Sequence, residues 1–279
     1  MKVTADSTCD LSREITAELG VDLIPLHVLI EGADYRDGVD ISSDDIFRCV
    51  DAEGKSCSTS AANVHEYETF FSQFADKYDA LVHICIGSGF SSSFQNAHIA
   101  SMSFKNVFIV DSANLSTGSG HLVCDAALLA KSGLDARSIL DTLEEIKPKI
   151  DASFVIERMD YLHKGGRCSG IELFGANLLK IKPCIEVKGG KMGVGRKYRG
   201  NFDRCLERYV EDRLEDIGSI DTERIFITHP ACPPEIVEGV KEAIRKCADF
   251  EQVIETRAGC TISSHCGPNT LGILFKRKA

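Results

Sequence analysis

A glycine- and serine-rich loop is the segment of this sequence best suited to chemistry. The apolar run at residues 81–86 leads into Gly87-Ser88-Gly89-Phe90-Ser91-Ser92-Ser93, where a helix is predicted to begin. The start of a helix presents unpaired N–H groups and a partial positive charge, and serine hydroxyls add further donors. Because one helix cap needs only one hydroxyl, three consecutive serines favour a binding site for an anion, either a phosphate or a carboxylate.

The same loop allows a second interpretation, as a dinucleotide-binding turn. Gly87-x-Gly89-x-x-Ser92 follows a predicted strand, and Asp111 ends the next strand, which is roughly where an acid for the ribose is found. Against this, the third glycine is replaced by Ser92, and the loop does not follow the first strand of its domain. An NAD(P)-binding oxidoreductase is therefore the alternative function.

Two further segments could supply polar groups to such a site. Lys55-Ser56-Cys57-Ser58-Thr59-Ser60 precedes a predicted helix, so its hydroxyls could lie near the first loop or act as an ordinary cap. Residues 261–269 are predicted to form a turn before the last strand, and they place His265 beside Gly267-Pro268. A lone histidine is usually structural, but at the mouth of a strand it is a better than average candidate for a donor.

Composition and charge narrow the classes of function. The 279 residues are 43% hydrophobic and 27% charged, with a formal net charge of −10, which suits a globular chain and not a general nucleic-acid binder. The twelve cysteines include no C-x-x-C pair, and the eight histidines form no cluster with ligand spacing, so we expect no metal. Since neither a signal-peptide pattern nor a membrane span is visible, we expect a cytoplasmic protein.

Alternating short apolar runs and helical patterns predict an α/β fold of two domains, 1–150 and 151–279. In the first domain, strands are predicted at 2–5, 23–30, 81–86 and 107–110, and helices at 12–19, 44–50, 63–78, 92–102, 118–131 and 136–146. In the second, strands are predicted at 153–157, 182–187, 191–197, 224–228, 250–255 and 271–275, with helices at 202–214 and after Pro233-Pro234.

Taken in order along the chain, these segments resemble the DegV family of fatty-acid-binding proteins. The motifs that match are Asp6-Ser7-Thr8-Cys9-Asp10-Leu11, Pro25-Leu26, Tyr35-Arg36-Asp37, Thr59-Ser60, Ser88-Gly89-Phe90-Ser91 with Gln95, Asp111-Ser112, Gly165-Gly166-Arg167, Lys182-Pro183, Arg199-Gly200 and His265-x-Gly267-Pro268. Each motif alone is weak evidence for the family, but the whole set in this order is specific for it. The resemblance implies two domains, each a β-sheet flanked by helices, with a long-chain fatty acid of the palmitate or oleate class buried between them.

The resemblance also implies a role and a set of site residues. Family members are lipid carriers and not enzymes; they need no cofactor, and they present the acyl carboxylate to a separate fatty-acid kinase that makes acyl phosphate. The carboxylate is expected to be held by helix N-terminal amides and by Thr59, Ser60, Ser91, Ser92 and His265. The acyl slot could be lined by Leu26, Phe90, Ile99, Leu173 and Leu178.

Residues 180–199 form a basic segment in this acidic chain. They hold seven cations and a single acid, Glu186. The single carboxylate of a fatty acid cannot pair with seven cations. We therefore expect this segment to bind a partner: an acidic kinase surface, a nucleotide phosphate or an anionic membrane. Arg167 and Arg199 are the leading candidates, because each adjoins a glycine in a family motif and a guanidinium fork suits phosphate.

Overall fold

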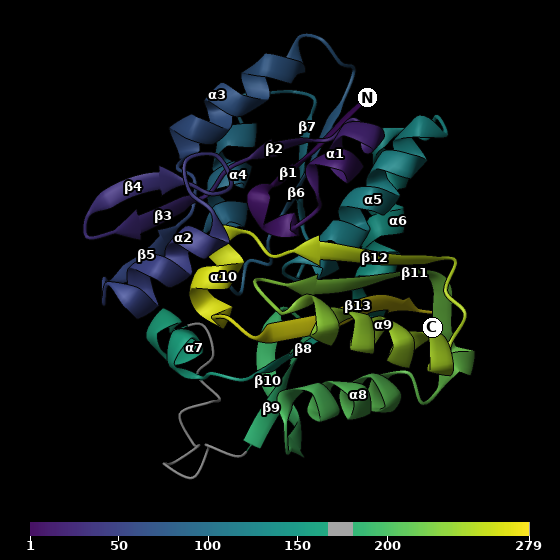
Figure 1. The fold of residues 1–279 in the computed structure, drawn as a ribbon. Coiled ribbons are helices and arrows are strands. Elements are labelled where there is room, and N and C mark those ends of the chain that lie inside the picture. The colour runs from purple at the N-terminus through teal and green to yellow at the C-terminus, as the bar shows by residue number, and fades with distance from the viewer. Residues whose placement is uncertain (167–180, 279) are drawn as a thin grey trace.

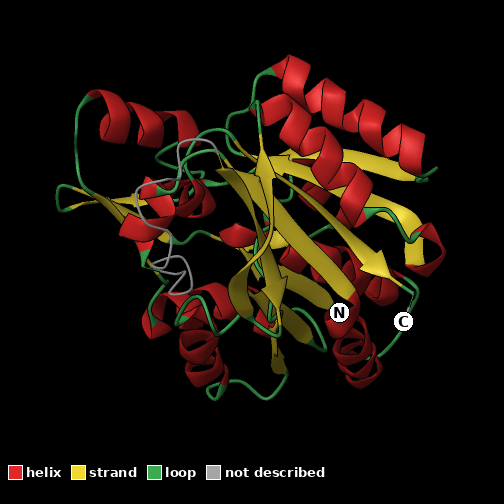
Figure 2. Ribbon diagram, turned by 90° about the horizontal axis from the view of Figure 1, so that it is seen from below, coloured by secondary structure: helices red, strands yellow, loops and turns green. Residues whose placement is uncertain are grey.

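The computed structural model describes residues 1–166 and 181–278, which form three β-sheets with helices around them (Figure 1). The first sheet is parallel, with the strand order β2 (Asp22–Ile24), β1 (Lys2–Asp6), β6 (Leu81–Cys85) and β7 (Val107–Asp111). Figure 2 shows the helices, in red, flanking the strands. The α/β class with helix-flanked sheets that the sequence predicts is confirmed.

Both faces of the parallel sheet are covered. Leu81 and Cys85 pack with apolar residues of α3 (Val64–Ala75) and α4 (Ser93–Ser101), while Val82 and Ile84 pack with those of α5 (Thr117–Lys131). Alternate residues of a strand point to opposite faces, so the whole of β6 is buried, as expected for a charge-free central strand. The remaining helices of this half are α1 (Arg13–Leu19), α2 (Ser43–Phe47) and α6 (Ala136–Ile146).

A second, antiparallel sheet of three strands has the order β4 (Ala33–Arg36), β3 (His27–Ile30) and β5 (Cys57–Ser60). The single strand predicted over 23–30 is wrong: Pro25, which has no N–H to donate to a ladder, separates β2 in the first sheet from β3 in this one. Strands β4 and β5 carry too few apolar residues to be recognised by alternation. Strand β5 of this sheet carries Thr59 and contacts α10 (Cys260–Cys266).

The third sheet has six strands and comes from the second half of the chain. Its order is β10 (Lys191–Arg199), β9 (Ile181–Lys188), β8 (Ile150–Ile156), β13 (Thr270–Arg277), β11 (Ile220–His229) and β12 (Gln252–Arg257). Helices α8 (Phe202–Arg213) and α9 (Pro234–Cys247) cover one face, and α5 covers the other. Because α5 lies between two sheets, residues 117–127 are buried on every side of the helix.

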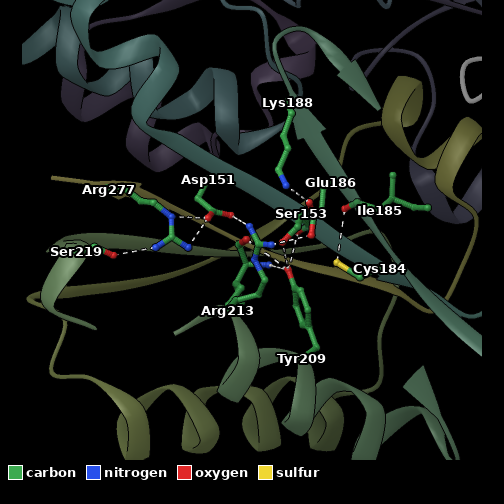
Figure 3. A network of polar contacts seen from close by, with 11 residues as sticks. Asp151, Ser153, Cys184, Ile185, Glu186, Lys188, Tyr209, Arg213, Ser219 and Arg277 are labelled. Atoms are coloured by element: carbon green, nitrogen blue, oxygen red, sulfur yellow. Dashed lines mark hydrogen bonds and ion pairs between the residues drawn. The ribbon is translucent and has the colours of Figure 1, made fainter. Parts of the chain in front are cut away.

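An ion-pair network ties α8 to this sheet (Figure 3). Arg213 of α8 donates to Asp151 of β8 and, at 2.9 Å, to Glu186 of β9. Arg277 of β13 donates to the other oxygen of Asp151 at 2.8 Å. These groups are largely buried, so each charge needs its partners, and the network links α8 to strands β8 and β9.

Helix α10 (Cys260–Cys266) joins the two halves of the chain. The sequence predicts a turn here; the structure instead has a helix that contacts α2, β3 and β5 of the first half and α7 (Asp160–Gly165) of the second (Figure 1). Its first N–H groups are capped from far away: Asp37 accepts from Cys260 N at 2.7 Å and from Thr261 N at 3.1 Å. Caps supplied by distant residues leave no local signature, which explains the wrong prediction.

Candidate functional site

A cavity lies where the parallel sheet, the small sheet and α10 meet. Its wall is mostly apolar, with Leu26, Ile86, Phe90, Leu115, Leu162, Met192 and Ile262 among the lining residues. The polar lining residues are Thr59, Ser60, Ser91, Thr261 and His265, so both halves of the chain contribute.

Thr59 and His265 are in direct contact in this wall. Thr59 Oγ1 and His265 Nε2 form a hydrogen bond of 2.8 Å, although one residue lies on β5 and the other in the last turn of α10. The same two residues also line a polar cleft, together with Lys55, Tyr161 and Lys164. The Thr59–His265 pair therefore stands between an apolar cavity and a polar cleft.

The serines of the loop take different positions. Ser91 lines the cavity, and its Oγ lies 2.8 Å from Ser93 Oγ and accepts from Ser93 N at 3.2 Å. Ser92 is exposed at the start of α4 and is not a residue of the cavity wall. Ser60 lines the cavity, but its hydroxyl donates to the carbonyl of Ala61 at 3.1 Å. Ser91 is thus the loop hydroxyl best placed to meet a ligand in the cavity.

Asp111 and the loop glycines serve the packing of the loop itself. Asp111 accepts from Ser88 N at 3.0 Å and from Ala113 N at 2.8 Å. A side chain at Gly87 would come within 2.9 Å of Asn114 N, and one at Gly89 would overlap the carbonyl of Gly190 in the β9–β10 hairpin. The glycines thus let neighbouring backbone segments of the protein pack against the loop. The Asp111 carboxylate is already hydrogen-bonded to backbone N–H groups of the protein. The dinucleotide-binding interpretation is unsupported.

Three buried acidic side chains, Asp6, Asp10 and Asp37, accept hydrogen bonds from backbone N–H groups in and beside the cavity wall. Asp6 accepts from the N–H of the cavity residue Ile86 at 2.7 Å, and Asp10 accepts from Gly259 N, just before α10, at 2.8 Å. Asp37 caps α10 itself. Burial raises the pKa of Asp6 to about 6 and that of Asp10 to about 8. All three residues belong to motifs that match the family, which was the only sign of their importance in the sequence. Their hydrogen bonds join residues far apart along the chain, so these contacts cannot be predicted from the sequence.

Several lysines and arginines of the basic segment, residues 180–199, form ion pairs with acidic residues, so the segment has fewer free positive charges than its composition indicates. Lys182 pairs with Glu157 at 3.0 Å, Lys188 with Glu186 at 2.5 Å, and Arg196 with Asp212 of α8. Arg199 is exposed at the end of β10, and no residue in the described part of the chain forms an ion pair with it. Arg167 lies outside the described residues.

The expected acyl-slot residues are only partly in place. Leu26 and Phe90 line the cavity, as expected. Ile99 is 41% exposed on α4 and is not a residue of the cavity wall. Leu173 and Leu178 lie outside the described residues. Within residues 1–166 and 181–278 no group of three His, Cys, Asp or Glu residues could hold a metal ion, and no helix is long and apolar enough to cross a membrane.

Comparisons with known proteins cover nearly the whole chain. A family model described as "Uncharacterised protein, DegV family" matches residues 1–278. A DegV domain-containing protein of Caldanaerobacter subterraneus subsp. tengcongensis is 30% identical over 278 residues, covering 99% of this chain and 98% of that relative. Two solved structures are similar over 99% of both chains. A Thermus thermophilus DegV family protein described by its fatty acid binding has 26% identity and a TM-score of 0.92. Bacillus subtilis DegV, a fatty acid binding protein, has 25% identity and a TM-score of 0.88.

Proposed function

The chain belongs to the DegV family, and on this premise we propose that it binds one long-chain fatty acid and presents the carboxylate to a fatty-acid kinase. The Thermus thermophilus and Bacillus subtilis proteins that share its fold are described as fatty acid binding. In this role the protein is a carrier of the palmitate or oleate class, with no chemistry and no cofactor of its own. The kinase forms the acyl phosphate.

The position of the Thr59–His265 pair carries this proposal. A buried carboxylate must have its oxygens hydrogen-bonded, and hydrogen bonds to a charged group contribute roughly 1.5–3 kcal/mol each. Thr59, His265 and Ser91 all line the apolar cavity, and since Thr59 and His265 share one hydrogen bond, the pair and Ser91 are the candidate donors to a carboxylate. Ser60 and Ser92 are further candidates, but the Ser60 hydroxyl is engaged with a carbonyl and the Ser92 side chain is exposed, so Ser92 would act through its backbone N–H.

The apolar wall suits the hydrocarbon tail. Leu26, Ile86, Leu115, Met192 and Ile262 come from five different segments and enclose the cavity without a charged side chain among them. Each methylene removed from water contributes ~0.8 kcal/mol. The tail would therefore supply most of the affinity, while the hydroxyls and His265 select an acid head over other lipids.

The cleft on the other side of the pair supports the proposed presentation to a kinase. A carboxylate at Thr59 and His265 faces Lys55 and Lys164 across the polar cleft, where a phosphoryl donor bound to a partner enzyme could reach it. Arg199, exposed on the β10 edge, is proposed to meet the partner or its nucleotide, and Arg167 is proposed with it. Transient contact with an anionic membrane during loading is compatible with the same exposed cations.

The direct experiment is mass spectrometry of an organic extract of the purified protein, followed by titration of delipidated protein with labelled palmitate or oleate. We expect a copurified fatty acid and saturable uptake of one equivalent per chain. An extract without lipid, combined with no saturable uptake, contradicts the proposal. Addition of NADH provides a control, since its fluorescence should not change.

A further inference from the structure

Thr261 is a buried cavity residue whose hydroxyl lacks a partner. It is 6% exposed, and its Oγ1 has no hydrogen-bond partner within the part of the chain that the structure describes. Its backbone N–H, in contrast, is satisfied by Asp37. A buried hydroxyl without a partner costs free energy, and valine would fill the same volume without that cost. A ligand that supplies the missing partner explains why a threonine can stand here.

The hydroxyl is offset from the proposed head group along one helix. Thr261 and His265 are four residues apart on α10, so they lie on the same helix face, and both line the cavity. Four residues of helix correspond to roughly 6 Å along its axis. His265 borders the polar cleft, whereas the Thr261 end is anchored by Asp37, which Ser7 links to Leu26 N of the apolar wall. Thr261 therefore lines the cavity about one helical turn from His265 and, unlike His265, does not border the polar cleft.

We propose that Thr261 makes the cavity selective for fatty acids that carry a hydroxyl or keto oxygen a few carbons from the carboxylate. This rests on the proposed function, because it places the carboxylate at Thr59 and His265. An extended chain advances roughly 1.2 Å per bond, so a separation of ~6 Å corresponds to about five bonds. An oxygen near carbon 5 completes the hydrogen bond of Thr261, whereas an unsubstituted chain leaves the Thr261 hydroxyl buried and unpaired.

The test compares stearate with 3-, 5- and 12-hydroxystearate on delipidated wild-type protein and on Thr261→Val. For wild type we expect the 3- or 5-hydroxy acid to bind about tenfold more tightly than stearate, with no gain for the 12-hydroxy acid. Thr261→Val should reverse this order: stearate binds more tightly than to wild type, and the hydroxy acids lose their advantage. Thr16→Val is the matched control, because Thr16 is a buried helical threonine of α1 that is not in the cavity wall.

Each other result overturns the proposal. If Thr261→Val weakens stearate and the hydroxy acids alike, Thr261 contacts the carboxylate. If Thr261→Val changes no affinity, or if wild type binds all four acids equally, the hydroxyl is satisfied without the ligand. Failure of stearate to bind wild-type protein at all is a different outcome, because it contradicts the fatty-acid function itself.

Discussion

Thr59 and His265 lie 206 positions apart in the sequence, and their side chains form a hydrogen bond of 2.8 Å. The contact exists because β5 and α10, one from each half of the chain, lie side by side. It sits on the boundary between an apolar cavity and a polar cleft. A ligand with an anionic head and an apolar tail has both of its ends satisfied at such a boundary, which is why the pair is central to our account.

Ser91→Ala should weaken palmitate binding by roughly ten- to a hundredfold, because the carboxylate loses a hydrogen bond worth ~1.5–3 kcal/mol. Ser92→Ala should have a smaller effect, since the Ser92 side chain is exposed outside the cavity. The measurement is displacement of a fluorescent fatty acid. Ser103→Ala, on the surface beyond the far end of α4, serves as control. Equal affinity in wild type and Ser91→Ala would place the head group elsewhere.

Arg199→Ala, alone or with Arg167→Ala, should leave palmitate affinity near wild type and lower the rate of acyl phosphate formation by a cognate fatty-acid kinase. Arg199 is exposed and outside the cavity wall, so its charge is available to a partner. The wild-type rate should fall as salt rises, because exposed charges are screened. Arg245→Ala removes an exposed arginine from α9 as a control. Loss of palmitate affinity in Arg199→Ala would instead assign this residue to the ligand site.

Gly89→Ala should destabilise the protein by about 1–3 kcal/mol, because the added methyl group overlaps the backbone carbonyl of Gly190. Gly193→Ala in β10 is the matched control, since its added carbon meets no atom within 4 Å. Urea unfolding measures both. The loop–hairpin contact also shapes the cavity through Phe90 and Met192, so Gly89→Ala should weaken palmitate binding as well. Equal stability of the two variants would contradict this packing.

Asp10 should make the protein less stable as pH rises. Burial raises the pKa of Asp10 from its ordinary value of 3.8 to about 8, so between these values the folded state holds a proton that the unfolded state has released. Stability then falls as pH increases from about 4 to about 8. In Asp10→Asn, which mimics the protonated group, unfolding free energies measured from pH 5 to 8 should decline less steeply. Parallel pH profiles for the two proteins would show that Asp10 is ionised in the fold.

The sequence predicted the parallel sheet well, because its signals are local. A charge-free run such as β6, and the reciprocal capping of α3 by Asn63 and Glu66, are readable from neighbouring residues. Helix α10 was missed because Asp37, 223 residues before Cys260, supplies its cap. The strand predicted over 23–30 divides at Pro25 between two sheets, a choice that depends on pairing partners far along the chain.

The candidate site was predictable in its residue types and not in its arrangement. Thr59, Ser91 and His265 were selected through motifs, and the structure brings all three to one cavity wall. The unpartnered hydroxyl of Thr261 could not be found in this way, because the lack of a partner is a property of the packed cavity. The same holds for Asp212, which neutralises Arg196 from a separate helix.

The most direct test of the central claim is carbon-13 NMR of carboxyl-labelled palmitate bound to the protein. We expect one bound carboxyl resonance at one equivalent per chain, clearly shifted in Thr59→Val and in Ser91→Ala and unchanged in Thr16→Val. Thr59→Val keeps the β-branched side chain and the backbone pairing of β5 with β3, so it removes the hydroxyl alone. A bound resonance with the same chemical shift in all four proteins would contradict a carboxylate held by Thr59 and Ser91.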